Sequence, residues 1–573
     1  MIISQAVVDG YERLAAWSDL LDGINVYPVA DGDTGRNLIV SLAPLRDYPL
    51  DGTATIEKLL MSARGNSGNI ASRFFSSFLK ISSIASIAGC VKEGSESARS
   101  AVDAPRNGTM LTLFDDLASW LEDKAGDFAD TGAVIARLEQ SVRSTRDMLP
   151  RLREAGVADS GALGMFLFFE GFFQSLSGKD KSFVPVTERF GDLIKIDPGF
   201  RETRENGFCV DMVLRVNGDA ADAAAEFSSM GESVVVIPGR DCLKVHLHTD
   251  DPEAVRARIG SIGTLMRWSS DDLGSQVRDF RSARKSAPIH IVSDAAGSLT
   301  REDALHWGIT LLDSYIIAGG YSVPETACSP EEIYSLMKKG VRVSTSQASV
   351  FERRQHYERL AGEHDLSLYL CVGSVYTGNY SAAAEWKKSG DPENRLRLID
   401  TGAASGKLGL AVLATARFAR LENNPDSIIS FAGKAVETCE EYLFLDRLHY
   451  LAAGGRMSKT GAFFGDLVGV KPVVGPFPDG ARKLGVVRRA EDQIAFALEK
   501  LEEALQGDSS PLIMIEYTDN REWVRDSVKG RIAGLFPGAE FIIQPLSLTT
   551  GAHTGPGTWG VAFLPGGMNH GER

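Results

Sequence analysis

The sequence predicts a chain of several domains: a helical N-terminal part, a small α+β middle domain and an α/β C-terminal part. Three patterns along the 573 residues support this division. Apolar residues recur first at helical spacing, then alternate at strand spacing, and finally form short apolar runs separated by helical stretches. We place the domains at residues 1–190, 191–285 and 288–573, since a chain of this length has room for about three or four domains of ordinary size.

The N-terminal part is predicted to be mainly helical. Ile135, Leu138, Val142 and Leu149 recur at the spacing of one buried helix face. Residues 163–173 are apolar on nearly all sides, which indicates a helix inside the core. Polar loops that contain glycine separate these helices and carry the first candidate site.

The middle domain is predicted from alternating residues. Segments 208–216 and 243–248 alternate like strands, and an alanine-rich helix is expected between them at 219–230. A polar, basic segment that ends in proline, residues 281–288, is typical of a linker.

The C-terminal part alternates between strands and helices. Helices are expected at 350–362 and 403–420, and strands at 289–292, 366–372, 396–399, 512–515 and 540–543. This rhythm predicts a parallel or mixed sheet covered by helices, with ligand-binding loops at the strand ends.

Composition argues against several classes of protein. The formal charge of -15 argues against a general nucleic-acid binder, because phosphate backbones require clustered Lys and Arg. No run of about 18 uninterrupted apolar residues exists, so no membrane span is expected. The N-terminus carries Asp9 and Glu12 and no basic segment, unlike a signal peptide. The six cysteines are scattered without a CxxC pair, so we expect a reduced, cytoplasmic setting.

The first candidate site begins with NVYPVADGDTGRNL, residues 25–38. Asp31 and Asp33 lie two residues apart, and carboxylates this close repel each other unless a cation lies between them. Mg²⁺ prefers such hard oxygen ligands and commonly joins them to nucleotide phosphates. The alternative is an ordinary acidic turn, because Asp-Gly-Asp is a common turn sequence.

Three further polar loops precede helical runs: ARGNSGN (63–69), GTMLT (108–112) and DSGALG (159–164). The first offers backbone N–H groups and the Ser67 hydroxyl at a helix N-terminus, a suitable cradle for phosphate. Each of the other two, taken alone, is a common kind of helix cap or turn. The sequence has no Walker A motif, so an ordinary P-loop is excluded.

In this order the four segments resemble the nucleotide-binding domain of dihydroxyacetone kinases of the DhaL type, and more closely the N-terminal domain of bacterial fatty acid kinase. The resemblance covers residues 1–190 and implies an all-helical barrel that binds ATP and Mg²⁺ at one end. It implies that Asp31 and Asp33 hold Mg²⁺ with Asn25 as a third ligand. It further implies that the nucleotide is lined by Asn37, Ser67, Gly68, Thr109, Met110, Asp159 and Gly161.

Two positions depart from the family pattern. Arg36 stands where the family usually has threonine, and Asn69 stands where it usually has a hydrophobic residue. Arg36 either contacts phosphate and supplies charge to the transition state, or is an exposed loop residue.

Cys209, His246 and His248 form the second candidate site. The two histidines lie two residues apart on a predicted strand and so share a face, and Cys209 lies on another strand of the same domain. Two imidazoles and a thiolate suit Zn²⁺, whereas a histidine pair alone is also common on an exposed strand. The stretches GFCVDM and KVHLHTDDP resemble the middle domain of fatty acid kinase, which implies a zinc site. Its role, structural or in phosphoryl transfer, stays open, as does its fourth ligand: water, substrate or Asp250.

The third candidate site is a set of five polar segments around the predicted sheet: IHIVSD (289–294), VSTSQAS (343–349), VYTGNYSAA (375–383), GGRMSK (454–459) and HTGPG (553–557). We expect a hydroxyl-rich loop in the second segment and a rigid turn at His553 in the last. Each segment alone is a common turn or helix cap. Together they offer Ser, Thr and His donors that can hold a carboxylate without a full salt bridge.

In this order the five segments resemble the DegV family over residues 288–573. Members bind a fatty acid in an apolar tunnel and carry it for fatty acid kinase. The resemblance implies that Thr345, Thr377 and His553 hydrogen-bond the carboxylate and that Arg456 faces the docking or phosphate-facing surface. We place four further residues in the same substrate site: Ser293, Ser346, Gly378 and Thr554.

The sequence therefore predicts a fatty acid kinase fused to its carrier, which transfers the γ-phosphate of ATP to the carboxylate of a long-chain fatty acid and yields an acyl-phosphate. Asp31 and Asp33, through Mg²⁺, together with Arg36, Arg456 or Lys459, would neutralise charge at the transferring phosphate. Fusion raises the local concentration of the carrier to about millimolar. We also expect a homodimer, a downstream acyltransferase that feeds phospholipid synthesis, transient contact with a membrane surface, and no nucleic-acid partner.

Two other functions stay open. A kinase for dihydroxyacetone or another small polyol explains the first domain but leaves the DegV-like part without a purpose. A lipid-binding or regulatory protein without turnover requires a decayed nucleotide site, although Asp31-Gly32-Asp33 and the GNSG sequence are intact.

Overall fold

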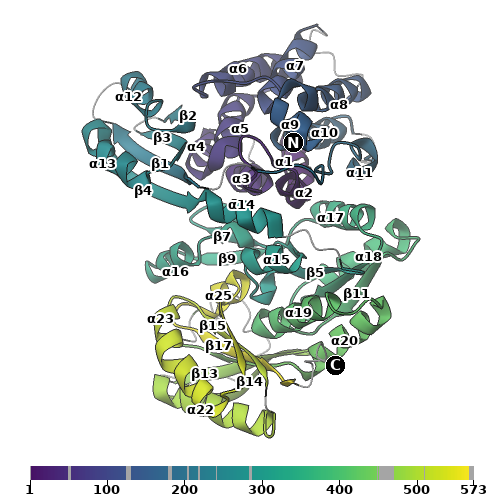
Figure 1. Ribbon diagram of the computed structural model, residues 1–573, viewed down its shortest axis with the longest axis vertical. Coiled ribbons are helices and arrows are strands. Elements are labelled where there is room, and N and C mark those ends of the chain that lie inside the picture. The colour runs from purple at the N-terminus through teal and green to yellow at the C-terminus, as the bar shows by residue number, and fades with distance from the viewer. Residues whose placement is uncertain are drawn as a thin grey trace. The chain divides into compact units, whose positions relative to one another are not determined.

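The computed structural model describes residues 2–48, 53–123, 131–178, 183–202, 206–216, 220–239, 242–282, 287–447, 450, 470–508 and 510–566. The chain divides into two compact units, Met1–Ser282 and Ala283–Arg573 (Figure 1). Among the residues described, no helix is both long and apolar enough to cross a membrane.

The first unit opens with helices, as predicted. They are α1 (Ile2–Ala15), α2 (Ser18–Gly23), α3 (Thr34–Leu42), α4 (Thr53–Ser62), α5 (Gly65–Phe78), α6 (Ile87–Ser100), α7 (Met110–Asp123), α8 (Thr131–Met148), α9 (Pro150–Ala155), α10 (Ser160–Leu176) and α11 (Val186–Arg189). The polar loops of the first candidate site lie directly before α3, α5, α7 and α10.

Helix α10 is the centre of this helical part. Every residue from Ser160 to Phe173 is buried, which confirms the helix predicted inside the core. Its phenylalanines contact α5: the rings of Phe168 and Phe75 meet edge to face with centroids 4.6 Å apart. Glu170, the charged residue of α10, is compensated by Arg13 of α1 at 2.8 Å.

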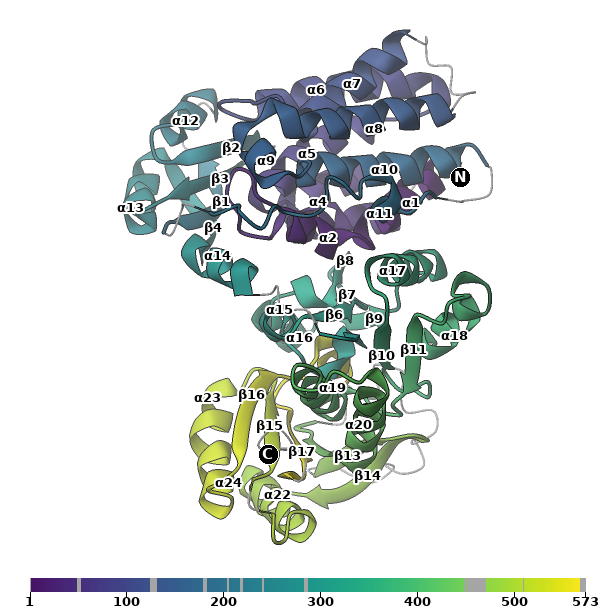
Figure 2. The same cartoon turned by 45° about the vertical axis from the view of Figure 1, so that its right-hand side comes forward.

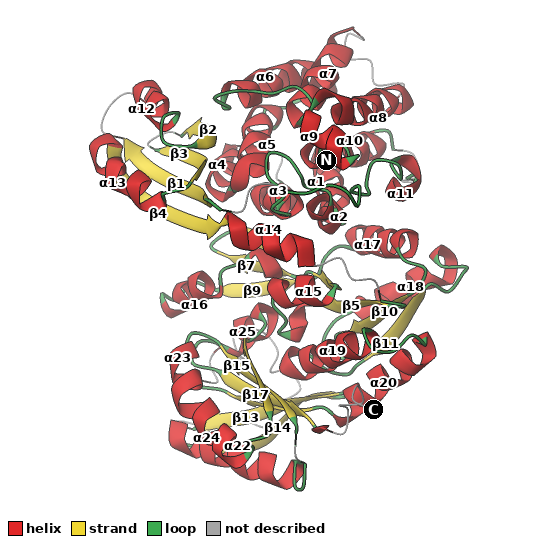
Figure 3. Ribbon diagram, in the orientation of Figure 1, coloured by secondary structure: helices red, strands yellow, loops and turns green. Residues whose placement is uncertain are grey.

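The middle domain is an antiparallel sheet in the order β2-β3-β1-β4. Its strands are β1 (Phe208–Val216), β2 (Glu232–Pro238), β3 (Leu243–Thr249) and β4 (Gly263–Asp272), and its helices are α12 (Ala220–Phe227), α13 (Pro252–Ile262) and α14 (Leu273–Ser282). Figure 3 shows this sheet beside the helical part of the same unit. The predicted strands at 208–216 and 243–248 and the helix at 219–230 are confirmed, and β2 and β4 are additional to the prediction.

Period-two alternation gives this sheet two different faces. Val210, Met212, Val245 and Leu247 belong to an apolar core shared with α12 and α13. The residues between them point to the opposite face, which meets the N-terminal end of α5. Polar side chains on β1 and β3 are thereby directed toward the helical part.

A short segment after α6 fixes the sheet to the helices. The N–H of Val236 in β2 donates to the carbonyl of Ala101 at 3.0 Å, and the N–H of Asp103 donates to the carbonyl of Val234 at 3.2 Å. Ile70 of α5 packs against the apolar side chains of this seam. The edge of β2 is thus paired by the helical part.

The described residues of the second unit form three sheets. The orders are β11-β10-β5-β6, β14-β13-β12-β17-β15-β16 and β8-β7-β9. The strands are β5 (His290–Asp294), β6 (Ile309–Leu312), β7 (Tyr315–Ala318), β8 (Tyr321–Pro324), β9 (Val343–Ser346), β10 (Ser367–Cys371), β11 (Leu396–Asp400), β12 (Glu440–Phe444), β13 (Lys471–Phe477), β14 (Gly480–Val487), β15 (Leu512–Tyr517), β16 (Glu540–Pro545) and β17 (Trp559–Leu564).

Helices cover these sheets and fill the space between them. They are α15 (Arg301–Trp307), α16 (Pro330–Lys338), α17 (Val350–Glu363), α18 (Asn379–Gly390), α19 (Ser405–Ala419), α20 (Pro425–Thr438), α22 (Ala490–Ala504), α23 (Arg521–Trp523), α24 (Lys529–Leu535) and α25 (Leu548–Thr554). Helices α19 and α20 lie between the four-stranded parallel sheet and the six-stranded mixed sheet (Figure 2). All five predicted strands and both predicted helices of this part are confirmed.

Two local expectations are wrong. The segment 343–349 is not a loop along its whole length, because Val343–Ser346 forms β9, where Thr345 lies opposite Ile316 of β7. β-branched residues such as Val343 and Thr345 favour a strand over a loop. His553 does not lie in the turn; it occupies the last turn of α25, and the turn follows where Gly555 adopts φ 84°.

Asp294, at the end of β5, holds together the carboxyl edge of the parallel sheet. Its carboxylate accepts hydrogen bonds from Arg353 of α17 at 3.1 Å, Tyr369 of β10 at 2.8 Å and the side chain of Asn379 at 2.8 Å. It also accepts the backbone N–H of Val372 at 2.8 Å. Both charges of the Asp294–Arg353 pair are almost fully buried, so each depends on the other.

We expect Arg353→Met to destabilise the second unit by about 3–5 kcal/mol, because it leaves the buried Asp294 carboxylate without its cation. Arg354→Met is the matched control, since Arg354 is the next residue of α17 and is exposed. The measurement is hydrogen exchange of the β5 and β10 amides in the full chain. Equal protection in the two variants would contradict the prediction.

Candidate functional site

The acidic pair lies in the loop before α3. Asp31 and Asp33 are half-buried and flank Gly32, whose φ of 67° is a conformation that suits glycine. The amide of Asn25 donates to Asp31 at 2.5 Å. Burial and the neighbouring charge of Asp33 raise the pKa of Asp31 well above its usual value, and burial also raises the pKa of Asp33.

The N-terminus of α5 faces this pair. Gly65, the first residue of α5, has a φ of 61°, and a Cβ there would lie 2.1 Å from the amide nitrogen of Asn37. The hydroxyls of Thr34 in α3 and Ser67 in α5 lie 3.3 Å apart. The two loops are therefore joined, and Gly65, Asn66 and Ser67 of the first turn of α5 line the same cavity as the carboxylates.

One cavity brings the first two candidate sites together. Its lining includes Asp31, Asp33, Ser67, Cys209, His246 and His248, with Asn25 and Asn37. The first three come from the helical part and the next three from the middle domain. The sequence places these two groups in separate domains and gives no reason to expect them in one cavity.

A second cavity adjoins the first and shares Thr34, Asn66 and Ser67 with it. The expected nucleotide residues Thr109, Met110, Asp159 and Gly161 line this second cavity. Its apolar walls include Pro28, Ile70 and Val102, which suit the flat face of a nucleobase.

Asp159 caps α10 at the floor of this cavity. Its carboxylate accepts the N–H of Ala162 at 2.7 Å. Burial raises its pKa to about 7, although the N–H groups that it accepts oppose that shift. Asp159 is thus a helix cap as well as a cavity residue.

Two expected residues lie elsewhere. Arg36 lines neither cavity, although its charge lowers the pKa of Asp33. Gly68 lines neither cavity either; a Cβ there would lie 2.0 Å from the hydroxyl of Ser41, so this glycine allows α5 to pack closely on α3.

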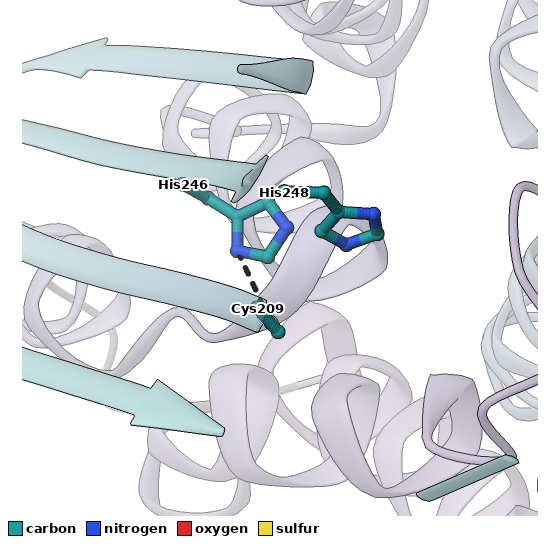
Figure 4. Close-up of side chains that lie close together, drawn as sticks. All are labelled: Cys209, His246 and His248. Carbon is teal, nitrogen blue, oxygen red and sulfur yellow. Dashed lines mark hydrogen bonds between the residues drawn. The ribbon is translucent and has the colours of Figure 1, made fainter. Parts of the chain in front are cut away.

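Cys209, His246 and His248 converge on the polar face of the middle sheet. Cys209 of β1 lies directly opposite His248 of β3, and His246 is two residues along on the same face. Their ligand atoms all lie within 4.8 Å of one another, and all three residues are buried. Figure 4 shows the thiol and the two imidazoles directed toward one another from adjacent strands.

The chemistry of this cluster fits a transition metal. Burial, together with the charges of Asp211, Asp33 and Asp31, raises the pKa of the Cys209 thiol well above its usual value, so a cation is needed to hold it as thiolate. The Nε2 atom of His246 is buried and makes no hydrogen bond among the residues described. A buried ring nitrogen beside a thiol and a second imidazole is a suitable zinc ligand.

Asp211 and Lys244 connect this cluster to the helical part. The carboxylate of Asp211 accepts the N–H of Gly65 at 3.1 Å and the amide of Asn69 at 3.2 Å. Lys244, two residues before His246, donates to the carbonyl of Ala63. The departure at Asn69 is thereby explained: its amide is buried and binds a carboxylate of the middle domain.

In the second unit Thr345 and His553 are brought together. The Thr345 hydroxyl and Nε2 of His553 lie 3.1 Å apart, although 208 residues separate them in the chain. Gly378 lies near Gln347, which follows β9. The loop that carries Thr377 therefore borders the residue that follows β9.

Three of the remaining expected substrate residues hydrogen-bond to the backbone. The hydroxyl of Ser293 donates to Leu370 at 3.1 Å, and that of Thr554 donates to Thr550 at 3.1 Å. The hydroxyl of Thr377 accepts the N–H of Asn379, the first residue of α18, at 3.2 Å. Ser346 ends β9, opposite Tyr315. Arg456 and Lys459 lie outside the described residues.

Tyr27, Arg106 and Ser233 are among the cavity residues absent from the sequence-based set. Tyr27 belongs to the segment 25–38 and lines both cavities, so its place in that segment could have identified it. Arg106 and Ser233 line the second cavity, Ser233 from β2. No local sequence signal identifies Arg106 and Ser233, because it is the pairing of β2 with the segment after α6 that brings them to the second cavity.

We expect Asp159→Asn to gain stability relative to the natural chain as pH rises. The folded state raises this pKa from about 4 to about 7, so the contribution of Asp159 is most favourable at low pH and is lost as pH rises through 7. Asn keeps the cap acceptor without ionising. The difference in unfolding free energy should grow by roughly 2–4 kcal/mol between pH 4 and pH 8. Urea unfolding of both proteins, free of nucleotide, measures it, and parallel stability curves would contradict it.

Three family models match successive parts of the chain. They describe a DAK2 domain over residues 28–174, a middle domain like that of the fatty acid kinase subunit over 205–280, and the DegV family of uncharacterised proteins over 288–566.

The chain is also similar to staphylococcal proteins. An uncharacterized protein of Staphylococcus haemolyticus is 28% identical over 401 residues, which cover 61% of this chain and 72% of that protein. One of Staphylococcus saprophyticus is 29% identical over 307 residues, which cover 48% of this chain and 56% of that protein. The chain thus spans little more than half the length of the second relative.

Among solved structures, the chain is similar to a DegV family protein from Thermus thermophilus, with 22% identity and a TM-score of 0.44 over 48% of this chain and 99% of that one. It is similar to DegV, a fatty acid binding protein from Bacillus subtilis, with 21% identity and a TM-score of 0.45 over 49% of this chain and 100% of that one. From the family models, the chain joins a DAK2 domain, a middle domain of the fatty acid kinase type and a DegV-family domain in one polypeptide.

Proposed function

We propose that this protein is a fatty acid kinase, which transfers the γ-phosphate of ATP to the carboxylate of a fatty acid bound by its DegV-family domain and forms an acyl-phosphate. One observation carries the proposal: the acidic pair, the N-terminus of α5 and the Cys209–His246–His248 cluster line a single cavity that adjoins the cavity around Asp159. The two adjoining cavities therefore offer ligands for a cation, donors for phosphate and apolar walls for a base side by side.

The helical part suits a bound nucleotide. The base would lie against Ile70 and Met110, while the phosphates would meet the N–H groups of α5 and the hydroxyl of Ser67. Asp31 and Asp33 would hold Mg²⁺, which neutralises phosphate charge when bound. Their raised pKa values fit this role, since two half-buried carboxylates without a cation repel each other.

The acceptor needs orientation more than activation. A fatty-acid carboxyl is ionised at neutral pH and needs no general base, so the obstacle is repulsion between two anions. Thr345 and His553 lie close enough together to bind one carboxylate oxygen jointly. The match to a middle domain of the fatty acid kinase type supports a fatty acid over a polyol as acceptor.

The Cys209–His246–His248 cluster would hold Zn²⁺. Its three side chains leave a fourth position, and they line the cavity of the acidic pair. That location favours a role near the phosphates over a purely structural one. A downstream acyltransferase would consume the acyl-phosphate, and we propose a homodimer as the working state.

The reaction is tested by incubating the full chain with ATP, Mg²⁺ and a panel of long-chain fatty acids and trapping the product as acyl-hydroxamate with hydroxylamine. Asp31→Ala should lower product formation at least about 100-fold, because the charge of the transferring phosphate is no longer neutralised. Asp47→Ala is the control, since Asp47 is exposed and lines neither cavity.

Two results would reject this function. Wild-type protein that binds fatty acid but yields no acyl-hydroxamate would indicate a lipid-binding protein without turnover. Phosphorylation of dihydroxyacetone in place of fatty acid would indicate a polyol kinase.

The carboxylate site is tested by Thr345→Val, which keeps the shape of the side chain and removes the hydroxyl. We expect about 10- to 100-fold weaker binding of palmitate and oleate, because a hydrogen bond to a charged group is lost. Thr345→Ser keeps the hydroxyl and should bind as the natural chain does. Displacement of a fluorescent fatty acid measures both, and unchanged affinity in the valine variant would place the carboxylate elsewhere.

A further inference from the structure

The side chain of Asp211 touches both the N-terminal turn of α5 and the Cys209–His246–His248 cluster. Its Oδ2 accepts the N–H of Gly65 at 3.1 Å, and its Oδ1 accepts the amide of Asn69 at 3.2 Å. The same Oδ1 lies 3.3 Å from Nδ1 of His246. One carboxylate therefore joins the first residue of α5, a side chain one turn further along, and a histidine of the cluster.

Strand geometry explains why Asp211 occupies this place. It lies two residues after Cys209 on β1 and directly opposite His246 on β3, so it projects from the same face as the cluster. That face meets α5, where the N–H of Gly65 has no helical acceptor of its own. A carboxylate at this position is compensated by donors from both sides.

His246 presents its two nitrogens to different groups. Nδ1 faces Asp211 and also lies 3.9 Å from Sγ of Cys209, while Nε2 makes no hydrogen bond among the described residues. A proton on Nδ1, held by a carboxylate, leaves the lone pair on Nε2 for a metal, an arrangement common around ligating histidines. Asp211 is then a positioning residue for the cluster as well as for α5.

We propose that Asp211 couples the two halves of the cavity, so that a transition-metal ion on Cys209, His246 and His248 and the phosphates of a nucleotide at α5 each strengthen the binding of the other. This rests on the zinc site and the nucleotide site of the proposed function. Within it, Asp211 is a new element: a link between metal occupancy and nucleotide affinity.

The sign of the coupling follows from charge and geometry. A metal held by His246 would make its Nδ1–H a stronger donor, which would hold Asp211 more firmly. A fixed Asp211 in turn fixes Gly65, so the first N–H groups of α5 are ordered before the phosphates arrive. A divalent ion on one thiolate also adds net positive charge to the cavity, which favours an anion. All three effects have the same direction.

The test is the affinity of the full chain for Mg-ADP, measured by titration calorimetry with the cluster loaded with Zn²⁺ and after removal of Zn²⁺ by a chelator. We expect zinc to lower the Kd for Mg-ADP about tenfold, within the usual range of coupling between two sites. Reciprocity requires ADP to tighten zinc binding by the same factor, which competition with a chromophoric chelator measures. Circular dichroism and recovery on reloading with zinc check that the stripped protein stays folded.

Asp211→Asn is the decisive variant. It keeps the direct zinc ligands and an oxygen that can accept the N–H of Gly65, but it loses the charge that holds Nδ1–H. We expect this variant still to bind one zinc per chain. The ratio of its Kd for Mg-ADP without zinc to that with zinc should lie within about twofold of one, whereas the natural chain should show a ratio of about ten. Asp47→Asn is the control: Asp47 is an exposed carboxylate that lines neither cavity, and its variant should keep the full ratio. A residue with a merely structural role would change both Kd values without changing their ratio.

Asn69→Leu gives an independent measurement if Asp211→Asn does not fold. It removes one donor to Asp211 without touching the cluster, and the ratio should fall below that of the natural chain. An unchanged ratio in these variants, or equal ADP affinity of loaded and stripped natural protein, would overturn the coupling. ADP binding needs no turnover, so the two proposals can fail separately. If zinc leaves the Kd for Mg-ADP unchanged but acyl-hydroxamate still forms, only the coupling is rejected. If zinc lowers the Kd for Mg-ADP as expected but no acyl-hydroxamate forms, the coupling is supported and only the proposed reaction is rejected.

Discussion

The first unit depends on the contact between the polar face of the middle sheet and the N-terminal end of α5. Buried polar groups are costly unless each finds a partner, and this contact supplies the partners. Lys244 binds the carbonyl of Ala63 before α5, and Asp211 binds the N–H of Gly65 at its first residue. The same alternation that directs Lys244 and Asp211 to this face also directs the cysteine and the two histidines there. The candidate metal cluster and the phosphate loop therefore share a cavity as a consequence of strand geometry.

Much of this unit could be predicted because its signals are local. The Asp31-Gly32-Asp33 turn, the GNSG helix start and the H-x-H strand each occupy a few consecutive residues. What could not be predicted depends on long-range packing. Ser233 reaches the second cavity only because β2 pairs with the segment after α6, and nothing around Asn69 reveals that its amide meets Asp211 from 142 residues away.

In the second unit, too, local signals could be predicted and long-range contacts could not. Its strands and helices follow from a strong alternation of apolar runs, and five of its strands appear where the pattern places them. The short segment that forms β9 gives a weak signal, because β-branched Val343 and Thr345 alternate with serines, and its pairing with β7 completes the strand. Motif order placed Thr345 and His553 in one site, and their 3.1 Å separation agrees with that placement. Ser293 and Thr554 share those motifs, but their hydroxyls bind backbone carbonyls, so motif membership alone does not identify ligand contacts.

Charge explains why this site requires added cations. Among the described residues that line the two cavities, Arg106 is the one arginine or lysine side chain, whereas Asp31, Asp33 and Asp159 are acidic. Lys244 is close to the cluster, but its amine is directed to backbone carbonyls. The N-terminus of α5 contributes only about half a positive charge, far less than a triphosphate carries in the opposite sense. The described lining of the two cavities therefore does not balance a nucleotide, and its carboxylates and thiol are the groups through which metal ions would bring positive charge.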